Sequence, residues 1–289
     1  MCNFNTDMAD ERVDEYKIIN NMSEIEGIEV KQFDYDEFKI TEVNVLNEKG
    51  KNAIGKEIGK YVTIDIEGIK YLENEGLLIE KIKEELEKII SKDMSIFVVG
   101  LGNMYVTPDA LGAKVVKGID ITRHILKLSN HYKDFKTREV SSICPGVMGN
   151  TGIETTEIVS AVTQLVKPNV VIVIDSLMSK SIDRVGSSIQ ISNTGITPGS
   201  GITGINSIID ENSLNAKVIS VGVPMVVDIA TIANEIMDKV DKDYSISNER
   251  YNKIKEALDI QNYIVTPKDI DELIEVASRI IATSINSII

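Results

Sequence analysis

Three short runs of mostly β-branched residues constrain the fold of this chain more than any other feature of its sequence. They cover residues 95–100 (SIFVVG), 169–175 (NVVIVID) and 217–224 (KVISVGVP). Such nearly continuous apolar runs are typical of parallel strands that are buried on both faces of a sheet. Residues 154–166, between two of these runs, carry one apolar stripe at helical spacing. This alternation predicts an α/β fold with a mostly parallel, doubly wound sheet that is flanked by helices.

The rest of the chain has different patterns. Residues 61–67 (YVTIDIE) alternate apolar and polar side chains, which predicts a half-buried strand in an antiparallel setting. Residues 77–91 have the spacing of a helix. Thr266, Pro267 and Asp269 predict the N-cap, first position and third position of a final helix, whose apolar face would pack on the sheet. No repeat or linker divides the sequence, so we expect a single α/β domain with an N-terminal β-rich elaboration.

The composition argues against several classes of protein. The chain of 289 residues carries 45 acidic and 31 basic residues, a formal net charge of −14 that does not favour a nucleic-acid-binding surface. No apolar run reaches the roughly 18 residues that span a bilayer, and the acidic N-terminus is unlike a signal peptide. Only two cysteines are present, without metal-ligand spacing. We therefore expect a cytoplasmic protein with no membrane and no direct nucleic-acid partner.

Two aspartates are candidates for chemistry because ligands of open parallel sheets collect beyond the carboxyl ends of the strands. Asp175 directly follows five apolar residues of a predicted strand. Asp109 follows Thr107 and Pro108, which resemble the N-cap and first position of a helix. Either acid could simply cap or decorate a helix, and spacing does not show whether the two strands are neighbours. If the carboxyl groups meet, they could share one proton and activate water against an amide.

Glycine-rich loops could supply backbone N–H groups to a substrate carbonyl. They lie at residues 149–152 (GNTG) and 195–201 (GITPGSG), and a further glycine-containing turn covers residues 222–224. Donors of this kind stabilise the negative charge that develops on a carbonyl oxygen. Each loop could equally be an ordinary tight turn.

Several sharper motifs fail on inspection. Residues 100–105 (GLGNMY) lack the third glycine of a dinucleotide-binding fingerprint, and Ser200 lacks the flanking glycines of a nucleophile elbow. Cys144 could act as a thiol nucleophile with His124 or His131 as its base, but a lone cysteine is more often part of the core. None of these motifs therefore competes with the two aspartates.

Many stretches of the sequence, in order along nearly the whole chain, resemble the germination proteases of spore-forming bacteria. The matching stretches are residues 53–56 (AIGK), 99–103 (VGLGN), 106–112 (VTPDALG), 145–149 (PGVMG), 151–154 (TGIE), 189–190 (IQ), 198–201 (PGSG) and 222–224 (GVP). Each stretch is modest alone, whereas so many in order are specific. The stretch after about residue 241 is the least distinctive.

The resemblance implies a function. The family comprises endopeptidases that degrade small acid-soluble spore proteins when the spore germinates, are made as self-processing zymogens and assemble as homotetramers. Its fold is similar to that of hydrogenase-maturation proteases, and its proposed catalytic aspartates fall on Asp109 and Asp175. The resemblance thus implies a protease of the forespore and spore core that needs no cofactor. Candidate substrate or oxyanion contacts are Asn103, Gly149, Glu154, Gly199 and Ser200.

The N-terminus resembles the processing site of the same family. Asp7 precedes an apolar residue, an alanine, any residue and a glutamate, in the order Met8, Ala9, Asp10 and Glu11. The pattern is also similar to the cleavage site of the spore-protein substrates. We expect a cut between Asp7 and Met8, which would divide the chain into a short propeptide, residues 1–7, and a protease domain, residues 8–289.

Two alternatives remain open at the level of sequence. In the first, Asp109, Asp175 and a third donor such as Glu154 or His124 would hold a cation for metal-assisted hydrolysis. In the second, the chain would bind spore proteins without cutting them. The sequence shows no ordinary metal-ligand motif, so we favour water activation by the two aspartates.

Overall fold

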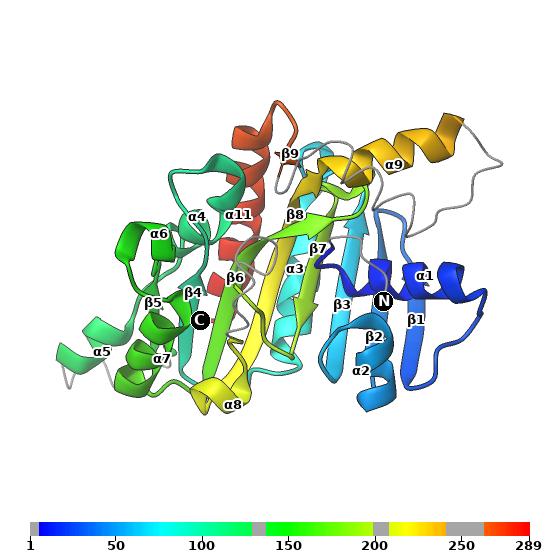
Figure 1. The fold of residues 1–289 in the computed structure, drawn as a ribbon. Helices are drawn as coiled ribbons and strands as arrows, with labels where there is room; N and C mark the ends of the chain where they lie inside the picture. The colour runs from blue at the N-terminus through cyan, green and yellow to red at the C-terminus, as the bar shows by residue number, and fades with distance from the viewer. Residues whose placement is uncertain (1–5, 129–136, 199–207, 241–262) are drawn as a thin grey trace.

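A mixed sheet of nine strands runs through the part of the protein that the structure describes. The computed structural model describes residues 6–128, 137–198, 208–240 and 263–289 (Figure 1). The strands are β1 (Ile28–Asp34), β2 (Phe38–Val45), β3 (Gly59–Ile66), β4 (Ile96–Gly100), β5 (Val140–Ile143), β6 (Val170–Ser179), β7 (Ser188–Ser192), β8 (Lys217–Asp228) and β9 (Ile264–Val265). Their order is β1-β2-β3-β7-β8-β6-β4-β5, and β9 pairs with β8.

The sheet has a parallel half and an antiparallel half. The three predicted β-branched runs form β4, β6 and β8, which are parallel and adjacent, with β5 beside β4. The predicted antiparallel strand is β3, which joins β2 and β7, and β7 pairs antiparallel with β8. The α/β class and the N-terminal β-rich part are therefore confirmed. The added strands extend the same sheet, which makes it mixed.

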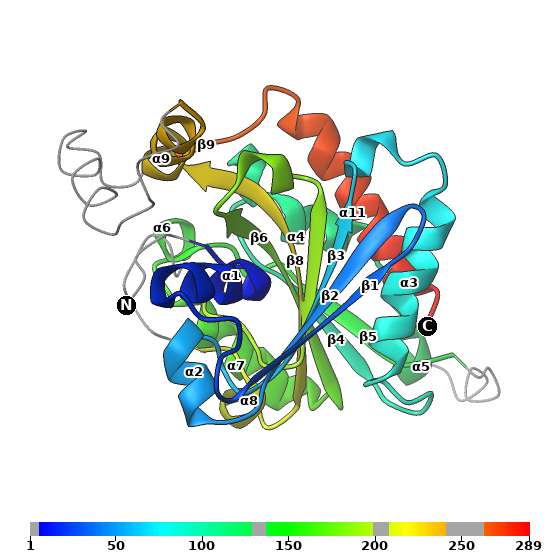
Figure 2. The ribbon, with the colours of Figure 1, turned by 90° about the vertical axis from the view of Figure 1, so that its right-hand side faces the viewer.

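Helices cover both faces of this sheet. They are α1 (Ala9–Asn20), α2 (Glu48–Ile54), α3 (Glu75–Glu87), α4 (Leu111–Lys117), α5 (Arg123–Leu128), α6 (Met148–Thr151), α7 (Thr155–Val166), α8 (Glu211–Leu214), α9 (Ile229–Val240) and α11 (Ile270–Asn286), with 3₁₀ turns η1 (Ile69–Tyr71), η2 (Thr107–Asp109) and η4 (Ile182–Arg184). Figure 2 shows α3 and α11 on one side of the strands and α1 and α2 on the other. In the part of the chain that the structure describes, no helix is long and apolar enough to cross a membrane.

The two faces bury separate cores. On one face, α3, α4 and α11 pack on the apolar side chains of the central strands, with Leu86, Val115 and Ile274 fully buried. Each such side chain contributes about 1.5–3 kcal/mol through its removal from water. The other face has two smaller cores, one below α7 and α8 and one below α1 and α2.

The predicted helices are present, with shifted bounds. The helix expected over residues 77–91 is α3, which begins two residues earlier and ends four residues earlier, and that over residues 154–166 is α7. The last helix, α11, begins at Ile270, three residues later than Pro267 predicts. The reason is local, because the Thr266 hydroxyl donates to the carbonyl of Met225 and so holds the chain against β8 instead of capping the helix. The apolar face of α11 is buried as expected.

Candidate active site

Asp175 lies inside a strand, whereas the sequence places it at a strand end. β6 continues to Ser179, where it still pairs with β8. β4, however, stops at Gly100, opposite Ile174. Asp175 is therefore the first residue of β6 beyond the end of β4, and it pairs with Gly222 of β8 on its other side. The predicted position at the carboxyl edge of the parallel strands is correct with respect to β4 only.

Asp109 belongs to the loop that follows β4. It lies in the first turn of the short 3₁₀ helix η2, as the sequence suggests for a helix start, but the α-helix α4 begins only at Leu111. The backbone N–H of Asn103 donates to Asp109 Oδ2 at 2.7 Å. Gly102 makes this approach possible, since its φ is +94° and an added Cβ would lie 2.1 Å from the Asp109 carbonyl oxygen. This glycine therefore lets the loop fold back on Asp109.

The Asp109 carboxylate influences the ionisation of Asp175. Burial raises the pKa of Asp175 well above its ordinary value of 3.8, and the carboxylates of Asp109 and Asp7 raise it further. The hydrogen bond from the N–H of Ser176 to Asp175 Oδ1 acts in the opposite direction. Burial also raises the pKa of Asp109, against the hydrogen bond from Asn103. The Asp109 carboxylate therefore favours the protonated form of Asp175.

The N-terminal segment lies across the same site. The N–H of Asp7 donates to the carbonyl of Met178 at 2.9 Å, and the N–H of Met178 donates to Asp7 Oδ2 at 2.8 Å. Lys56 Nζ and Gln190 Nε2 both donate to the carbonyl oxygen of Asp7, at 2.7 Å and 3.1 Å. Asp7, Lys56, Asp175 and Gln190 line one pocket of about 270 Å³. The carbonyl group of Asp7 is thus held in the pocket that Asp175 lines.

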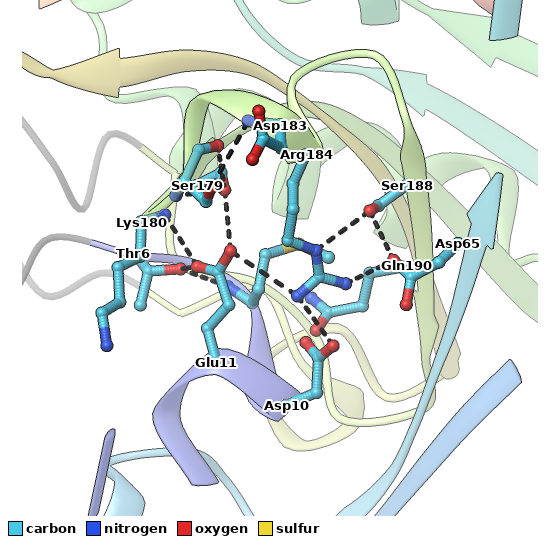
Figure 3. A network of polar contacts seen from close by, with 12 residues as sticks. Thr6, Asp10, Glu11, Asp65, Ser179, Lys180, Asp183, Arg184, Ser188 and Gln190 are labelled. Atoms are coloured by element: carbon cyan, nitrogen blue, oxygen red, sulfur yellow. Dashed lines mark hydrogen bonds and ion pairs between the residues drawn. The ribbon is translucent and has the colours of Figure 1, made fainter. Parts of the chain in front are cut away.

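The residues that follow Asp7 are also held by specific contacts. Met8 and Ala9 are fully buried. Glu11 accepts hydrogen bonds from the Ser179 hydroxyl and from the N–H of Lys180, both at 2.7 Å, and from the Thr6 hydroxyl (Figure 3). The apolar positions of the sequence pattern around the expected cut are therefore buried, and its glutamate is bound by hydrogen bonds.

Arg184 joins the N-terminal segment to the sheet. Its guanidinium lies 2.8 Å from Asp10 Oδ2 and donates to Asp65 Oδ1 at 2.6 Å, as Figure 3 shows. The Ser188 hydroxyl also donates to Asp65 Oδ1, and Arg184 Nε donates to Ser188 Oγ. This one cation thus links α1, β3 and η4.

We expect the replacement Arg184→Met to lower the free energy of unfolding by about 3 kcal/mol, because it leaves the carboxylates of Asp10 and Asp65 without their cation. Denaturant unfolding measures this loss. The matched control is Arg279→Met, since Arg279 pairs with Glu75 at an exposed position and its loss should cost less than about 1 kcal/mol. Equal losses for the two variants would contradict the structural role of Arg184.

The other predicted site residues have different fates. Asn103 is brought to Asp109, and its side-chain oxygen accepts from Asn150 Nδ2 at 3.2 Å, which places α6 next to this loop. Gly149 is exposed in α6, and an added Cβ would meet no atom within 4 Å, so nothing places it at the pocket. Glu154 is the N-cap residue of α7. Gly199 and Ser200 lie outside the described residues.

Neither the metal alternative nor the thiol alternative gains a site from the arrangement. Within residues 6–128, 137–198, 208–240 and 263–289, no group of three or more His, Cys, Asp or Glu side chains could hold a metal ion, so Glu154 and His124 do not join the two aspartates. Cys144 is exposed, contrary to the expectation that it belongs to the core. The reason is that β5 ends at Ile143, so Cys144 lies outside the strand. His131 lies outside the described residues.

Three residues at the site were missed by sequence reasoning. Lys56, Arg184 and Gln190 come from the antiparallel half of the sheet and the turns beside it. Sequence reasoning searched only the carboxyl ends of the predicted parallel strands. A weak signal existed for two of them, because Lys56 and Gln190 belong to stretches that carry the family resemblance. Gln190 is also a polar residue between the buried Ile189 and Ile191 of β7.

Comparisons with known proteins show the family to which the chain belongs. The hydrogenase maturation protease HycI from Thermococcus kodakarensis has a similar solved structure, with a TM-score of 0.39, 16% identity and coverage of 71% of this chain and 97% of that chain. The germination protease of Clostridium tetani is 41% identical over 97% of this chain and 94% of its own length. The germination protease of Bacillus subtilis is 43% identical over 76% of this chain and 62% of its own length. A family model described as germination protease matches residues 5–260. The chain belongs to the germination protease family of peptidases.

Proposed function

We propose that this peptidase starts the breakdown of small acid-soluble spore proteins when the spore germinates, with Asp109 and Asp175 as its catalytic pair. Membership of the family supports the substrate class. The observation that carries the assignment of residues is the position of Asp175, which lines the pocket that binds the carbonyl oxygen of Asp7; the Asp109 carboxylate and burial both raise the pKa of Asp175. A buried acid with an acidic neighbour is a common catalytic arrangement.

The pair would activate water in the manner of other carboxyl dyads. One ionised carboxylate takes a proton from water, and the resulting hydroxide attacks the peptide carbonyl. The second carboxyl group stays protonated and polarises or protonates the amide. Asp175 is the better candidate for the protonated partner, because burial and two neighbouring carboxylates all raise its pKa.

The first substrate of the enzyme would be its own N-terminus. We infer a cut between Asp7 and Met8, which releases residues 1–7 as a propeptide from a domain of residues 8–289. The support is the position of Asp7, whose carbonyl oxygen is bound in the pocket that Asp175 lines. Since residues 6–11 fill the place where a substrate would bind, the uncut chain would be a zymogen. The Asp10 carboxylate would be bound by Arg184, and the Glu11 carboxylate by the backbone N–H of Lys180.

One experiment tests the function. The purified full-length chain is incubated with a small acid-soluble spore protein, with and without EDTA, and both products are sequenced from their N-termini. We expect a matured chain that begins at Met8 and a spore protein cut after an acid, at equal rates in both samples. Loss of cleavage with EDTA would support the metal-assisted alternative. Binding without cleavage would support the alternative in which the chain only binds spore proteins. A matured chain that begins elsewhere would contradict the proposed cut.

The family also suggests where and in what form the enzyme works. We propose a homotetramer in the spore core, without a bound cofactor and without direct contact to DNA. The strongly acidic composition fits an enzyme that takes its substrates after their release from nucleic acid. Light scattering on the purified protein measures the number of subunits.

A further inference from the structure

The carbonyl oxygen of Asp7 is bound by two side-chain donors at once. Lys56 Nζ donates at 2.7 Å and Gln190 Nε2 at 3.1 Å. A carbonyl oxygen has two lone pairs, so these donors satisfy it completely. This oxygen belongs to the peptide bond for which we propose the cut. The two donors are therefore placed on the atom that becomes negatively charged when water attacks.

The orientation of the Gln190 amide is determined by a second contact. The backbone N–H of Ala9 donates to Gln190 Oε1 at 2.7 Å. Because a backbone N–H can only donate, Oε1 must face Ala9 and Nε2 must face Asp7. Gln190 thus holds the segment on both sides of Met8, and its N–H groups are available to a carbonyl oxygen.

The sheet places Gln190 and Asp175 on two sides of one glycine. Gly222 of β8 pairs with Asp175 of β6 and with Gln190 of β7. Residues that are paired on adjacent strands point to the same face of a sheet, so the side chains of Asp175 and Gln190 project together. Gly222 has no side chain between them, and all three line the pocket.

Lys56 reaches the site from the antiparallel half of the fold. It follows α2 and the left-handed Gly55, whose φ is +69°. The Lys56 side chain is half-buried, and burial lowers its pKa while the Asp7 carboxylate acts in the opposite direction. An ammonium group interacts more strongly with a full negative charge than with a neutral carbonyl. Its contact with Asp7 should strengthen as charge develops on the oxygen.

We propose that Lys56 and Gln190 are the oxyanion-binding pair of this enzyme, for its own processing and for spore-protein cleavage. The proposal rests on the proposed function, and it replaces the glycine loops near Gly149 and Gly199 as candidate donors. The pair would bind the carbonyl oxygen of the residue before the cut. A donor of this kind accelerates reaction by stabilising the transition state more than the bound substrate.

The step then balances as follows. Water forms a bond to the Asp7 carbonyl carbon and gives its proton to the ionised aspartate, while the carbonyl π electrons move to the oxygen that Lys56 and Gln190 hold. The oxyanion collapses, the bond to the Met8 nitrogen breaks, and the protonated aspartate gives its proton to that nitrogen. The pair ends with one proton, as it began. Because the oxygen is already bound, the acid of the pair is free to serve the leaving nitrogen.

The test measures the first-order rate of self-processing in the full-length chain. We expect Lys56→Met to slow it about 10²- to 10³-fold, which is the usual effect of removing one oxyanion donor, and Gln190→Met to slow it at least about tenfold. Lys51→Met is the matched control, since Lys51 lies in α2 and pairs with Glu57 instead; its rate should stay within about twofold. Thermal melting shows whether each variant is folded.

A chemical rescue separates catalysis from structure. In a chain with Cys2 and Cys144 replaced by serine, Lys56→Cys is alkylated with bromoethylamine, which restores an ammonium group at nearly the same place. We expect this product to regain at least about a tenth of the wild-type rate, whereas alkylation with iodoacetamide restores nothing. Equal recovery with both reagents would show a merely structural role and overturn the proposal.

The failure of this inference is distinguishable from the failure of the proposed function. If the wild-type chain cuts neither itself nor a spore protein, the proposed function is wrong. If the wild-type chain processes normally and the folded Lys56→Met and Gln190→Met chains process within about threefold of it, only the proposed oxyanion pair is wrong. If Lys56→Met does not fold, Gln190→Met and the rescue decide.

Discussion

The variant Asp175→Asn is expected to remain at full length under conditions in which the wild-type chain processes itself. Asparagine preserves the shape of the side chain but can neither hold nor release the proton that the dyad needs. Because positioned acids and bases contribute about 10²- to 10⁴-fold each, we expect a loss of at least about 10³-fold. The rate is measured by mass spectrometry of the N-terminus over time. The rate of self-processing should fall by a similar factor in Asp109→Asn if the two groups act as one unit.

The control for this prediction is Asp183→Asn. Asp183 lies eight residues after Asp175 in the exposed part of η4, so its replacement tests the general effect of losing one acid near the site. Normal processing by Asp175→Asn and Asp109→Asn, with EDTA present, would show that neither carboxyl group is required. Loss in Asp183→Asn to the same degree would show that the effect is not specific.

The variant Asp175→Asn should also change the stability of the protein. The pKa of Asp175 is raised in the folded protein, so the unfolded chain ionises at lower pH than the folded one. The stability associated with this group is fully present below the pKa of the unfolded state and is lost as pH rises toward the folded pKa. Asp175→Asn has no such loss. It should therefore be more stable than the wild type at neutral pH, and the difference should vanish in acid.

Sequence periodicity accounts for most of the fold. The β-branched runs predict β4, β6 and β8 because parallel strands that are buried on both faces need apolar residues at every position. The helices α3 and α7 follow from their apolar stripes. What periodicity does not show is the order of strands, since β7 and the strands before it join the sheet next to β8 through contacts that are distant in sequence. The mixed character of the sheet follows from those contacts.

Element boundaries were less predictable, for local reasons. β6 passes through Asp175 because β8 continues alongside it to Asp228 and supplies backbone partners for the polar residues that follow. The final helix starts late because the Thr266 hydroxyl binds a carbonyl of β8. Both differences come from tertiary hydrogen bonds, which leave no periodic trace in the sequence.

The site itself could be predicted only in its parallel half. Asp109 and Asp175 follow β-branched runs, where a search for chemistry naturally begins. Lys56 and Gln190 are brought to the site by the antiparallel strands, and neither has a neighbour in sequence that indicates a pocket. The N-terminal β-rich part is therefore more than an elaboration, because it supplies Lys56 directly and its strand β3 pairs with β7, which carries Gln190.

Self-processing is expected to become about tenfold slower for each pH unit above the higher pKa of the aspartate pair. The proposed mechanism needs one protonated carboxyl group, and Asp175 is the group whose pKa is raised most clearly, by burial, by Asp109 and by Asp7. As pH rises through this pKa, the fraction of chains with a protonated Asp175 falls in proportion. This decrease is the falling limb of the pH–rate profile. Processing rates across a series of buffers at constant ionic strength measure the pH at which the limb begins.

The variant Asp7→Asn identifies the contribution of the N-terminal segment to this limb. Its side-chain oxygen can still accept the hydrogen bond from the N–H of Met178, whereas the charge that raises the pKa of Asp175 is lost. The falling limb should therefore move to lower pH, whatever happens to the maximal rate. The processed enzyme, which has lost Asp7, should show the same displacement in kcat/KM for a spore protein, because this constant reports the pKa values of the free enzyme before the acid of the substrate binds. A limb that stays in place in both cases would mean that Asp175 is not the group whose proton controls the reaction.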